Sequence, residues 1–250
     1  MKKIILPILL GLGLVAVSCQ DRLEIPQKGV VAYDNFYASD ADAEAARADM
    51  YVNFLSNVAG TEGIDNPQQV ILNYAADDVL PAGGDKKDHD AFRIFGEFTY
   101  GDASGTLKEC YQRYYFAIYH CNLVISNFTS ENRNQTEPKW KSAYTEQIVA
   151  EARVLRAYLH LCTALMWNRP PLMDRCYEPD EDITNAGSQD EILNWVIDQC
   201  DLAIATKKLP VRKGTGDKNA TAKMTVGFAQ FVAGKAAMFN NDPATARKYL

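Results

Sequence analysis

Two long segments with apolar residues on two faces constrain the fold of this chain more than any other feature. In residues 138–167, apolar side chains recur every three or four positions as two sets, Ile148, Ala152, Leu155, Leu159, Cys162 and Met166, and Val154, Tyr158, Leu161 and Leu165. Residues 106–128 show the same double pattern. A helix that is apolar on two faces needs a neighbour on each, as in layered helical arrays. The sequence therefore predicts an all-α fold.

Further helices are indicated by spacing and by capping residues. Ser39 and Asp42 precede a helix over about 40–56, and Ser188 with Glu191 begins another. A segment rich in small residues predicts a helix over 221–239. Asp242 followed by proline begins a last helix over 244–250. No convincing strand-like alternation occurs along the chain.

Two stretches are expected to be loops. Residues 57–105 contain repeated glycines and prolines, with aromatic residues spaced among polar ones, and residues 172–187 are rich in acids. Long irregular segments in a helical domain are frequent places for function.

The first residues resemble an export signal. Lys2 and Lys3 precede an apolar run of about 14 residues, which ends in small residues just before Cys19. A run of this length is too short to cross roughly 30 Å of hydrocarbon, which disfavours the alternative of a membrane anchor helix. The expected organisation is a signal over 1–18, an extended segment over 19–38 and a helical domain over 39–250.

The remaining five cysteines, Cys110, Cys121, Cys162, Cys176 and Cys200, are an odd number and form no C-x-x-C pair. This spacing excludes a zinc ribbon and a thioredoxin-like motif. Four of the five lie in helical apolar patterns, where a free cysteine behaves as a small buried apolar residue. For an exported protein, the alternative of one or two disulfides among these cysteines is kept.

Charge and motifs exclude several classes of function. The 32 acidic residues exceed the 26 basic ones, for a net charge of −6, and no long basic run is present, so nucleic acid is not an expected partner. The chain lacks H-E-x-x-H, G-x-S-x-G, P-loop and dinucleotide-binding motifs, and we expect no enzyme activity and no cofactor.

Two charged groups favour structural interpretations. Asp85, Asp88 and Asp90 lack the spacing and glycine of an EF-hand, and a solvated acidic loop is preferred over calcium binding. Glu151 and its neighbouring arginines belong to a helical scaffold, where ion pairing is preferred over a chemical role.

Several motifs, in order along the chain, resemble the SusD/RagB family of outer-membrane nutrient-binding lipoproteins of Bacteroidetes. They are CQDRLEIPQKG from Cys19, YYFAIYHCNLVISNF over Tyr114–Phe128, EARVLRAYLHLCTALMWNRPPLM over Glu151–Met173, DEILNWVIDQCDLAIATKKLP and FNNDPATARKYL. The chain departs from the family at Asn168–Leu172, where glycine is usual. It is also much shorter than family members, and we expect it to be either a fragment of a longer protein or the product of a truncated open reading frame.

The resemblance implies a tetratricopeptide-like array of helix pairs and a lipid on Cys19 that anchors the chain to the outer membrane, exposed at the cell surface. Its implied function is to bind oligosaccharides and deliver them to a TonB-dependent, SusC-like transporter. The alternative function is a protein-binding scaffold of the transporter complex without a glycan site of its own.

A glycan site needs aromatic platforms flanked by polar groups, and the region around residues 74–114 contains both. The candidate residues are Asp77, Asp78, Arg93, Phe95, Phe98, Tyr100, Tyr111 and Tyr114. Tyr111 stands where the family pattern often has a tryptophan. The competing interpretation makes the phenylalanines core residues beneath a long loop.

Overall fold

A computed structural model of the protein describes residues 35–58, 67–76, 79, 83–85, 87–88, 90–131, 136–218 and 220–249. The predicted signal, Cys19 and most of the extended segment lie outside the described residues. Residues 1–36 and 37–250 form separate units, and only Asn35 and Phe36 of the first are described. All that follows concerns the second unit.

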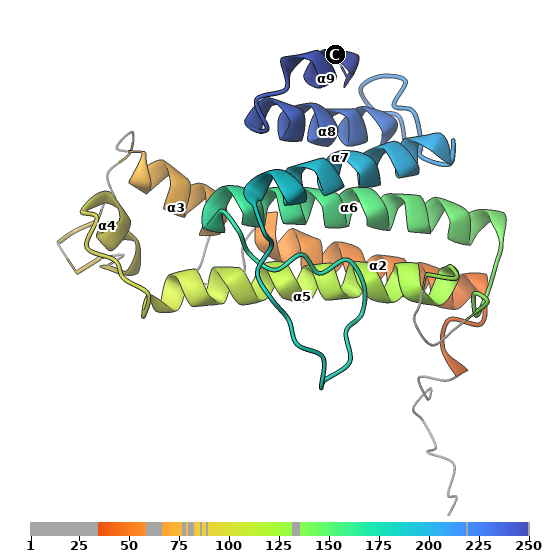
Figure 1. Ribbon diagram of the computed structural model, residues 1–250, viewed down its shortest axis with the longest axis horizontal. Helices are drawn as coiled ribbons and strands as arrows, with labels where there is room; N and C mark the ends of the chain where they lie inside the picture. Colours follow the sequence, from red (N-terminus) through yellow and green to blue (C-terminus); the bar gives the residue numbers. More distant parts are fainter. Residues whose placement is uncertain are drawn as a thin grey trace, which may run out of the picture. The chain divides into compact units, whose positions relative to one another are not determined.

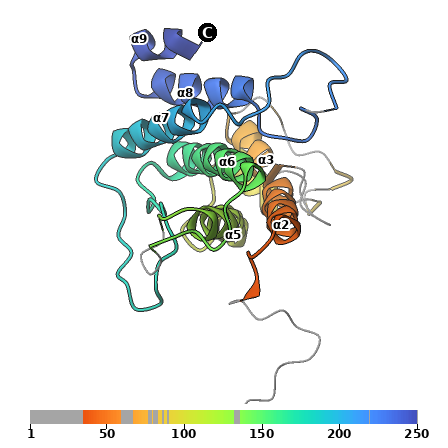
Figure 2. The same ribbon diagram turned by 90° about the vertical axis from the view of Figure 1, so that its right-hand side faces the viewer.

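The second unit is helical, and its described residues contain no strand. Its elements are α2 (Asp40–Val58), α3 (Pro67–Ala75), α4 (Asp90–Gly96), α5 (Gly105–Phe128), α6 (Ala143–Trp167), α7 (Gln189–Ala205), α8 (Val226–Phe239), α9 (Pro243–Ala246) and the 3₁₀ turn η2 (Arg247–Tyr249). Figure 1 shows α5, α6, α7, α8 and α9 stacked in chain order. The view along the helices places α2 beside α5 and below α6 (Figure 2). The all-α prediction is confirmed.

Helix α6 lies at the centre of the stack and explains the double apolar pattern. It packs against α5, α7, α2 and α8, so that every side of it has a neighbour. Val154 and Leu161 from one apolar set are as fully buried as Leu155 and Leu159 from the other. Burying each leucine contributes about 1.5–3 kcal/mol, so this helix contributes strongly to apolar stabilisation.

Two helices begin later than the sequence predicts. Helix α6 starts at Ala143 rather than near residue 138, because Ser142 and Thr145 form a reciprocal capping box there. Helix α8 starts at Val226 rather than at 221, because the Thr225 hydroxyl accepts the Phe228 N–H at 3.1 Å. Other predicted starts are confirmed, including Ser188 at α7 and Asp242 at α9. The last helix is shorter than predicted, since α9 ends at Ala246 and the chain continues as the 3₁₀ turn η2.

The predicted loop over 57–105 is wrong in part, since it contains α3 and α4. These short helices pack on each other at the end of the stack where α5 begins and α6 ends (Figure 1). Phe92 and Phe95 hold α4 in place by burying their rings. Seven to nine residues carry too few turns for the apolar spacing to show in the sequence.

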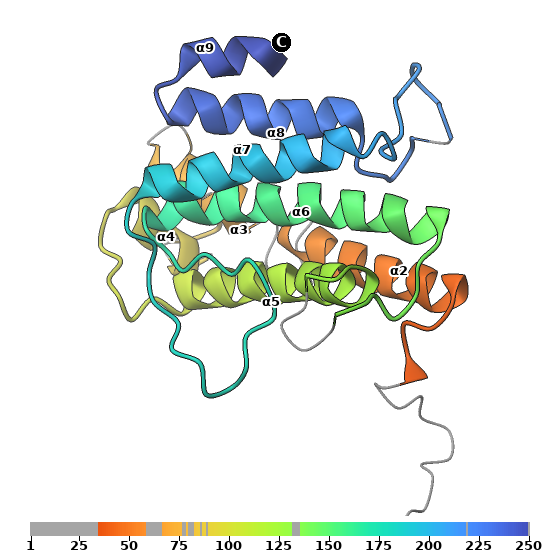
Figure 3. The ribbon, with the colours of Figure 1, turned by 45° about the vertical axis from the view of Figure 1, so that its right-hand side comes forward.

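The segment between α6 and α7, residues 168–188, is irregular as expected. Figure 3 shows it running down past α5 and returning to the start of α7. Among the described cysteines, Cys110, Cys121, Cys162 and Cys200 are buried and Cys176 is half-buried, and all five are free. In the described ranges, no helix combines the length and apolar character needed to span a bilayer.

Candidate functional site

Three aromatic side chains from different parts of the chain converge where α5 begins and α6 ends. Tyr111 is on the second turn of α5, Trp167 is the last residue of α6, and Tyr100 lies in the segment between α4 and α5. The rings of Tyr111 and Trp167 are perpendicular, with centroids 5.3 Å apart. An edge-to-face pair of this kind fixes the orientation of both rings.

These three residues line one pocket of about 500 Å³, together with Gly101, Asp102, Leu107 and Lys108. Its volume falls in the range of small-molecule sites. Asp102 and Lys108 supply one carboxylate and one ammonium group, both exposed. The pocket therefore combines aromatic faces with groups that accept and donate hydrogen bonds, and we call it the aromatic pocket.

Capping places the residues of the aromatic pocket. Ser104 precedes the first turn of α5, and its hydroxyl accepts the N–H of Leu107, which lines the pocket. At the other side, α6 ends directly after Trp167 because Asn168 adopts a positive φ of 63°. The helix end thus fixes where the Trp167 ring lies.

A second layer of aromatic residues supports the pocket. Tyr115 packs on Tyr111 with ring centroids 4.5 Å apart, and Tyr114 packs edge-on against Trp167 at 6.2 Å. Burial raises the pKa of both Tyr114 and Tyr115 above the ordinary value, so both phenols stay protonated. The Tyr115 hydroxyl donates to the Pro171 carbonyl oxygen at 2.7 Å.

The carbonyls that follow Pro171 are held by further side chains. Asn122 donates to the Met173 and Arg175 oxygens at 3.0 and 2.9 Å, and Arg156 donates to the Asp174 oxygen. His160 Nε2 lies 3.3 Å from the Met173 oxygen. Buried side chains therefore donate hydrogen bonds to the backbone carbonyl groups of this irregular segment, as the N–H groups of a neighbouring strand do in a sheet.

The structure brings only some of the predicted glycan-binding residues together. Tyr100 and Tyr111 line the aromatic pocket. Phe95 is 1% exposed and Tyr114 is 2% exposed, so neither reaches a ligand here. Phe95 instead supports Tyr100, at a centroid distance of 5.0 Å, as Tyr114 supports Trp167. The interpretation of Phe95 as a core residue fits this placement.

Arg93 and Phe98 lie outside the pocket lining. Arg93 forms ion pairs with Asp90 at the start of α4 and with Glu97 just after its end, and these pairs engage both terminal nitrogens of its guanidinium group. Phe98 is 62% exposed and has a positive φ of 54°. Asp77 and Asp78 lie outside the described residues, so their place relative to the pocket is not shown.

Of the seven lining residues, sequence reasoning missed five, among them one aromatic residue, Trp167, and two charged ones, Asp102 and Lys108. Trp167 lies about 60 residues from the other aromatic residues of the pocket, and only its position at a helix end, just before a turn, marks it. Asp102 and Lys108 flank the start of α5 and resemble ordinary exposed charges in the sequence.

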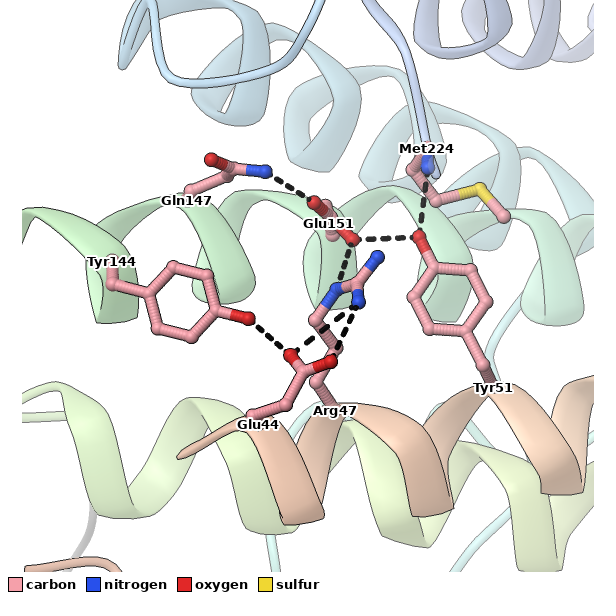
Figure 4. Close-up of polar contacts among 7 residues, drawn as sticks. All are labelled: Glu44, Arg47, Tyr51, Tyr144, Gln147, Glu151 and Met224. Carbon is pink, nitrogen blue, oxygen red and sulfur yellow. Dashed lines mark hydrogen bonds and ion pairs between the residues drawn. The ribbon is translucent and has the colours of Figure 1, made fainter. Parts of the chain in front are cut away.

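The polar cluster around Glu151 is a scaffold, as predicted, although its partner is a different arginine (Figure 4). The Glu151 carboxylate accepts from Arg47 and Tyr51 of α2 and from Gln147 of α6, at 3.0, 2.7 and 2.8 Å. Both oxygens of this fully buried carboxylate therefore accept hydrogen bonds from the protein, as expected for a structural ion pair.

The described residues contain no group of three histidine, cysteine or acidic side chains that could hold a metal ion. In the acidic loop, Asp88 accepts hydrogen bonds from the backbone N–H groups of Gly84 and Asp85. Its carboxylate thus stabilises a turn of its own loop.

No family model and no curated protein sequence matches the chain, but solved structures do. A laminarin-binding SusD-like protein matches with a TM-score of 0.69 at 18% identity, over 85% of this chain and 43% of that protein. Surface glycan-binding protein A from Bacteroides thetaiotaomicron, in complex with laminarihexaose, matches with a TM-score of 0.64 at 19% identity. This match covers 84% of this chain and 42% of that protein. The protein of the same name from Bacteroides uniformis matches with a TM-score of 0.69 at 17% identity, over 84% of this chain and 44% of that protein.

The chain spans less than half the length of these proteins. At such identities the likeness concerns the fold, since one fold can carry many functions. It confirms, at the level of the fold, the resemblance that the sequence motifs indicate. The chain has the all-α fold of SusD-like proteins.

Proposed function

We propose that the chain binds an oligosaccharide in the aromatic pocket. The observation that carries this proposal is the convergence of Tyr100, Tyr111 and Trp167 on one pocket that also holds Asp102 and Lys108. A sugar ring presents apolar C–H groups on its faces and hydroxyl groups around its rim. The aromatic rings can cover the faces, while the charged side chains bond the hydroxyls.

The comparisons support a sugar as the ligand. Two of the matched structures are named for laminarin or contain laminarihexaose, and these proteins share the fold that positions the pocket. We further propose that the whole protein is anchored at the cell surface through Cys19 and passes its ligand to a TonB-dependent transporter. This part rests on the sequence motifs at the N-terminus and along the helices.

Titration calorimetry with laminarin oligosaccharides and a panel of other glycans tests the proposal. We expect Tyr111→Ala and Tyr100→Ala each to weaken binding about tenfold, equivalent to about 1.4 kcal/mol. Phe116→Ala is the matched control, because Phe116 is an exposed aromatic residue of the same helix that does not line the pocket. Its affinity should stay within twofold of the unmodified protein.

Two outcomes would contradict the proposal. The first is that no glycan of the panel binds to a folded protein. The second is that Phe116→Ala and Tyr111→Ala weaken binding equally. If glycans fail to bind while a co-expressed transporter still co-purifies, the alternative of a protein-binding scaffold replaces the glycan site.

A further inference from the structure

A second pocket lies between α2 and the segment that leads into α8. It has a volume of about 470 Å³, and its lining includes Arg47, Tyr51 and Phe54 of α2 and Arg212, Lys223 and Phe228 from the later part of the chain. None of its lining residues belongs to the aromatic pocket. Its size falls in the range of small-molecule sites. We call it the cationic pocket, because its charged lining residues are arginines and a lysine.

The charges that line this pocket are all positive. Arg47, Arg212 and Lys223 line it, and no aspartate or glutamate does. Three other pockets mix both signs, with the pairs Asp102 and Lys108, Glu146 and Lys208, and Glu181 and Arg175 as examples. In a chain with a net charge of −6, an all-cationic lining is a local exception that favours an anionic ligand.

Arg47 is held in a fixed position at the wall of the pocket (Figure 4). Its Nε donates to Glu151 at 3.0 Å, its Nη1 lies 3.4 Å from Glu44, and its guanidinium carbon lies 5.0 Å from the centre of the Tyr51 ring. Its Nη2 has no hydrogen-bond partner among the described residues. The side chain is 14% exposed, so a preoriented donor is available with little freedom left to lose.

The other two lining cations have no acidic partner in the described ranges. Arg212 donates through Nε to the Gly214 carbonyl oxygen at 3.3 Å, and this partner carries no charge. Neither Arg212 nor Lys223 forms an ion pair within the described part of the chain. Glu151 and Glu44 both pair with Arg47 and offset its charge, which leaves Arg212 and Lys223 as the lining cations without a carboxylate partner among the described residues.

Aromatic rings form the apolar wall. The Tyr158 ring packs against both Phe54 and Phe228, at centroid distances of 6.0 and 5.5 Å, and this holds the two phenylalanines in place. The backbone opposite is also fixed, because the Met224 N–H donates to the Tyr51 hydroxyl at 2.7 Å. A ligand for this pocket therefore needs an apolar face and an anionic group on one small body.

We infer that the cationic pocket is a second binding site, for a sugar that carries a carboxylate, such as a hexuronic acid unit of an acidic oligosaccharide. The C–H face of such a sugar would lie on Phe54 and Phe228, and its carboxylate would meet Arg47, Arg212 and Lys223. The preference for an anion rests on the pocket alone. The assignment of that anion as a sugar rests on the proposed function.

Titration calorimetry with matched ligands tests this inference. The probes are a β-1,4-linked glucuronic acid trimer and the β-1,4-linked glucose trimer. Each ring of the first carries a carboxylate where the ring of the second carries a hydroxymethyl group. We expect the acidic trimer to bind the 250-residue chain at least tenfold more tightly, and its affinity to fall between 50 and 500 mM NaCl because salt screens exposed charges. Equal affinity of the two trimers, or of inorganic sulfate and the acidic trimer, would overturn the inference.

Variants locate the site. The double variant Arg212→Gln, Lys223→Gln should lose at least tenfold in affinity for the acidic trimer. Lys213→Gln should stay within twofold, because Lys213 is an exposed neighbour of Arg212 that does not line the pocket. All three side chains lack ion pairs with described residues, so the variants should melt at the same temperature as the unmodified chain. Unchanged affinity in the double variant would refute the assignment.

The two proposed sites can fail separately. Tyr111→Ala should weaken the binding of neutral glycans in the aromatic pocket and leave the affinity for the acidic trimer unchanged. The double variant should weaken the binding of the acidic trimer and leave the affinity for neutral glycans unchanged. If Tyr111→Ala abolishes binding of the acidic trimer, that ligand occupies the aromatic pocket and the second site is refuted. If neutral glycans fail but the acidic trimer binds as expected, only the proposal for the aromatic pocket fails.

Discussion

Tyr51 and Glu151 lie 100 residues apart in the sequence and are joined by a 2.7 Å hydrogen bond in which the phenol donates to a fully buried carboxylate. The same phenol oxygen accepts the Met224 N–H at 2.7 Å. One side chain of α2 therefore connects α6 to the segment before α8. Burial and the neighbouring carboxylate raise the pKa of Tyr51, which keeps the phenol a donor.

The first prediction concerns the Glu151 carboxylate. Glu151→Ala should lower the free energy of unfolding by about 3–5 kcal/mol, because it leaves Arg47 without its buried partner and Tyr51 without its acceptor. Glu146→Ala, on the same helix, is the control. It removes a 2.8 Å ion pair with Lys208 in which both side chains are about 40% exposed, and should cost about 0–1 kcal/mol. Urea unfolding measures both, and equal losses would contradict the scaffold role of Glu151.

The second prediction concerns Arg156, which is buried without an ion-pair partner among the described residues. It donates to Asn122 Oδ1 at 2.6 Å, to Gln199 Oε1 at 2.8 Å and to the Asp174 carbonyl oxygen, and its guanidinium carbon lies 5.0 Å from the centre of the Trp195 ring. A lysine cannot reproduce these contacts in three directions. Arg156→Lys should therefore lower the free energy of unfolding by about 2 kcal/mol or more.

Hydrogen exchange locates the effect of this change. The amides of residues 172–176 should exchange faster in Arg156→Lys, because the carbonyls of this segment lose one of the donors that hold them. Arg169→Lys is the control, since Arg169 is exposed and donates to the Gly187 oxygen at 3.2 Å. Unchanged exchange in Arg156→Lys would show that Asn122, Tyr115 and His160 hold the segment without it.

The sequence predicts those parts of the fold that depend on local signals. The double apolar pattern correctly predicts α5 and α6, because a helix with two neighbours must be apolar on two faces. Ser188 and Asp242 correctly mark helix starts because a cap acts within one turn. The sequence does not predict α3 and α4, since seven to nine residues carry too few turns for their apolar spacing to show.

The sequence indicates two of the three aromatic residues that line the aromatic pocket. Tyr100 and Tyr111 are within eleven positions of each other and could be grouped from the sequence. Trp167 joins them only because α6 runs back along α5 and ends where α5 begins. The same holds for the cationic pocket, whose lining residues lie more than 150 positions apart. Contacts at that separation leave no periodic trace in the sequence.

The third prediction concerns pH. Burial lowers the pKa of His160 to about 3, although its contact with the Met173 oxygen acts in the opposite direction. The unfolded chain, with an ordinary histidine pKa of about 6.5, binds more protons than the folded chain between these values. Protonation therefore favours unfolding, and His160 should cost about 1.4 kcal/mol of stability for each pH unit below about 6.5.

The comparison with His160→Gln isolates this contribution, because the carboxylates titrate equally in both proteins. The free energy of unfolding should fall less steeply between pH 6.5 and pH 4.5 in the variant, and the two slopes should agree above pH 7.5. Parallel slopes for the unmodified protein and His160→Gln would show that His160 is protonated in the folded state.

The last prediction concerns the turn that ends α6 beside the aromatic pocket. Asn168 has φ 63° and ψ −71°, and the Arg169 N–H donates to the Trp167 carbonyl oxygen at 2.7 Å. This is the γ-turn geometry that strains any residue with a Cβ atom. Asn168→Gly should raise the free energy of unfolding by about 1 kcal/mol, since relief of strain exceeds the entropy that glycine adds to the unfolded chain.

Asn240→Gly is the control. Asn240 lies at the end of α8 with φ −81°, so the change relieves no strain and should lower the free energy of unfolding by about 0.5–1 kcal/mol. Thermal unfolding separates the two, and a loss of stability in both would show that the Asn168 side chain holds the turn, and with it the Trp167 ring, in place.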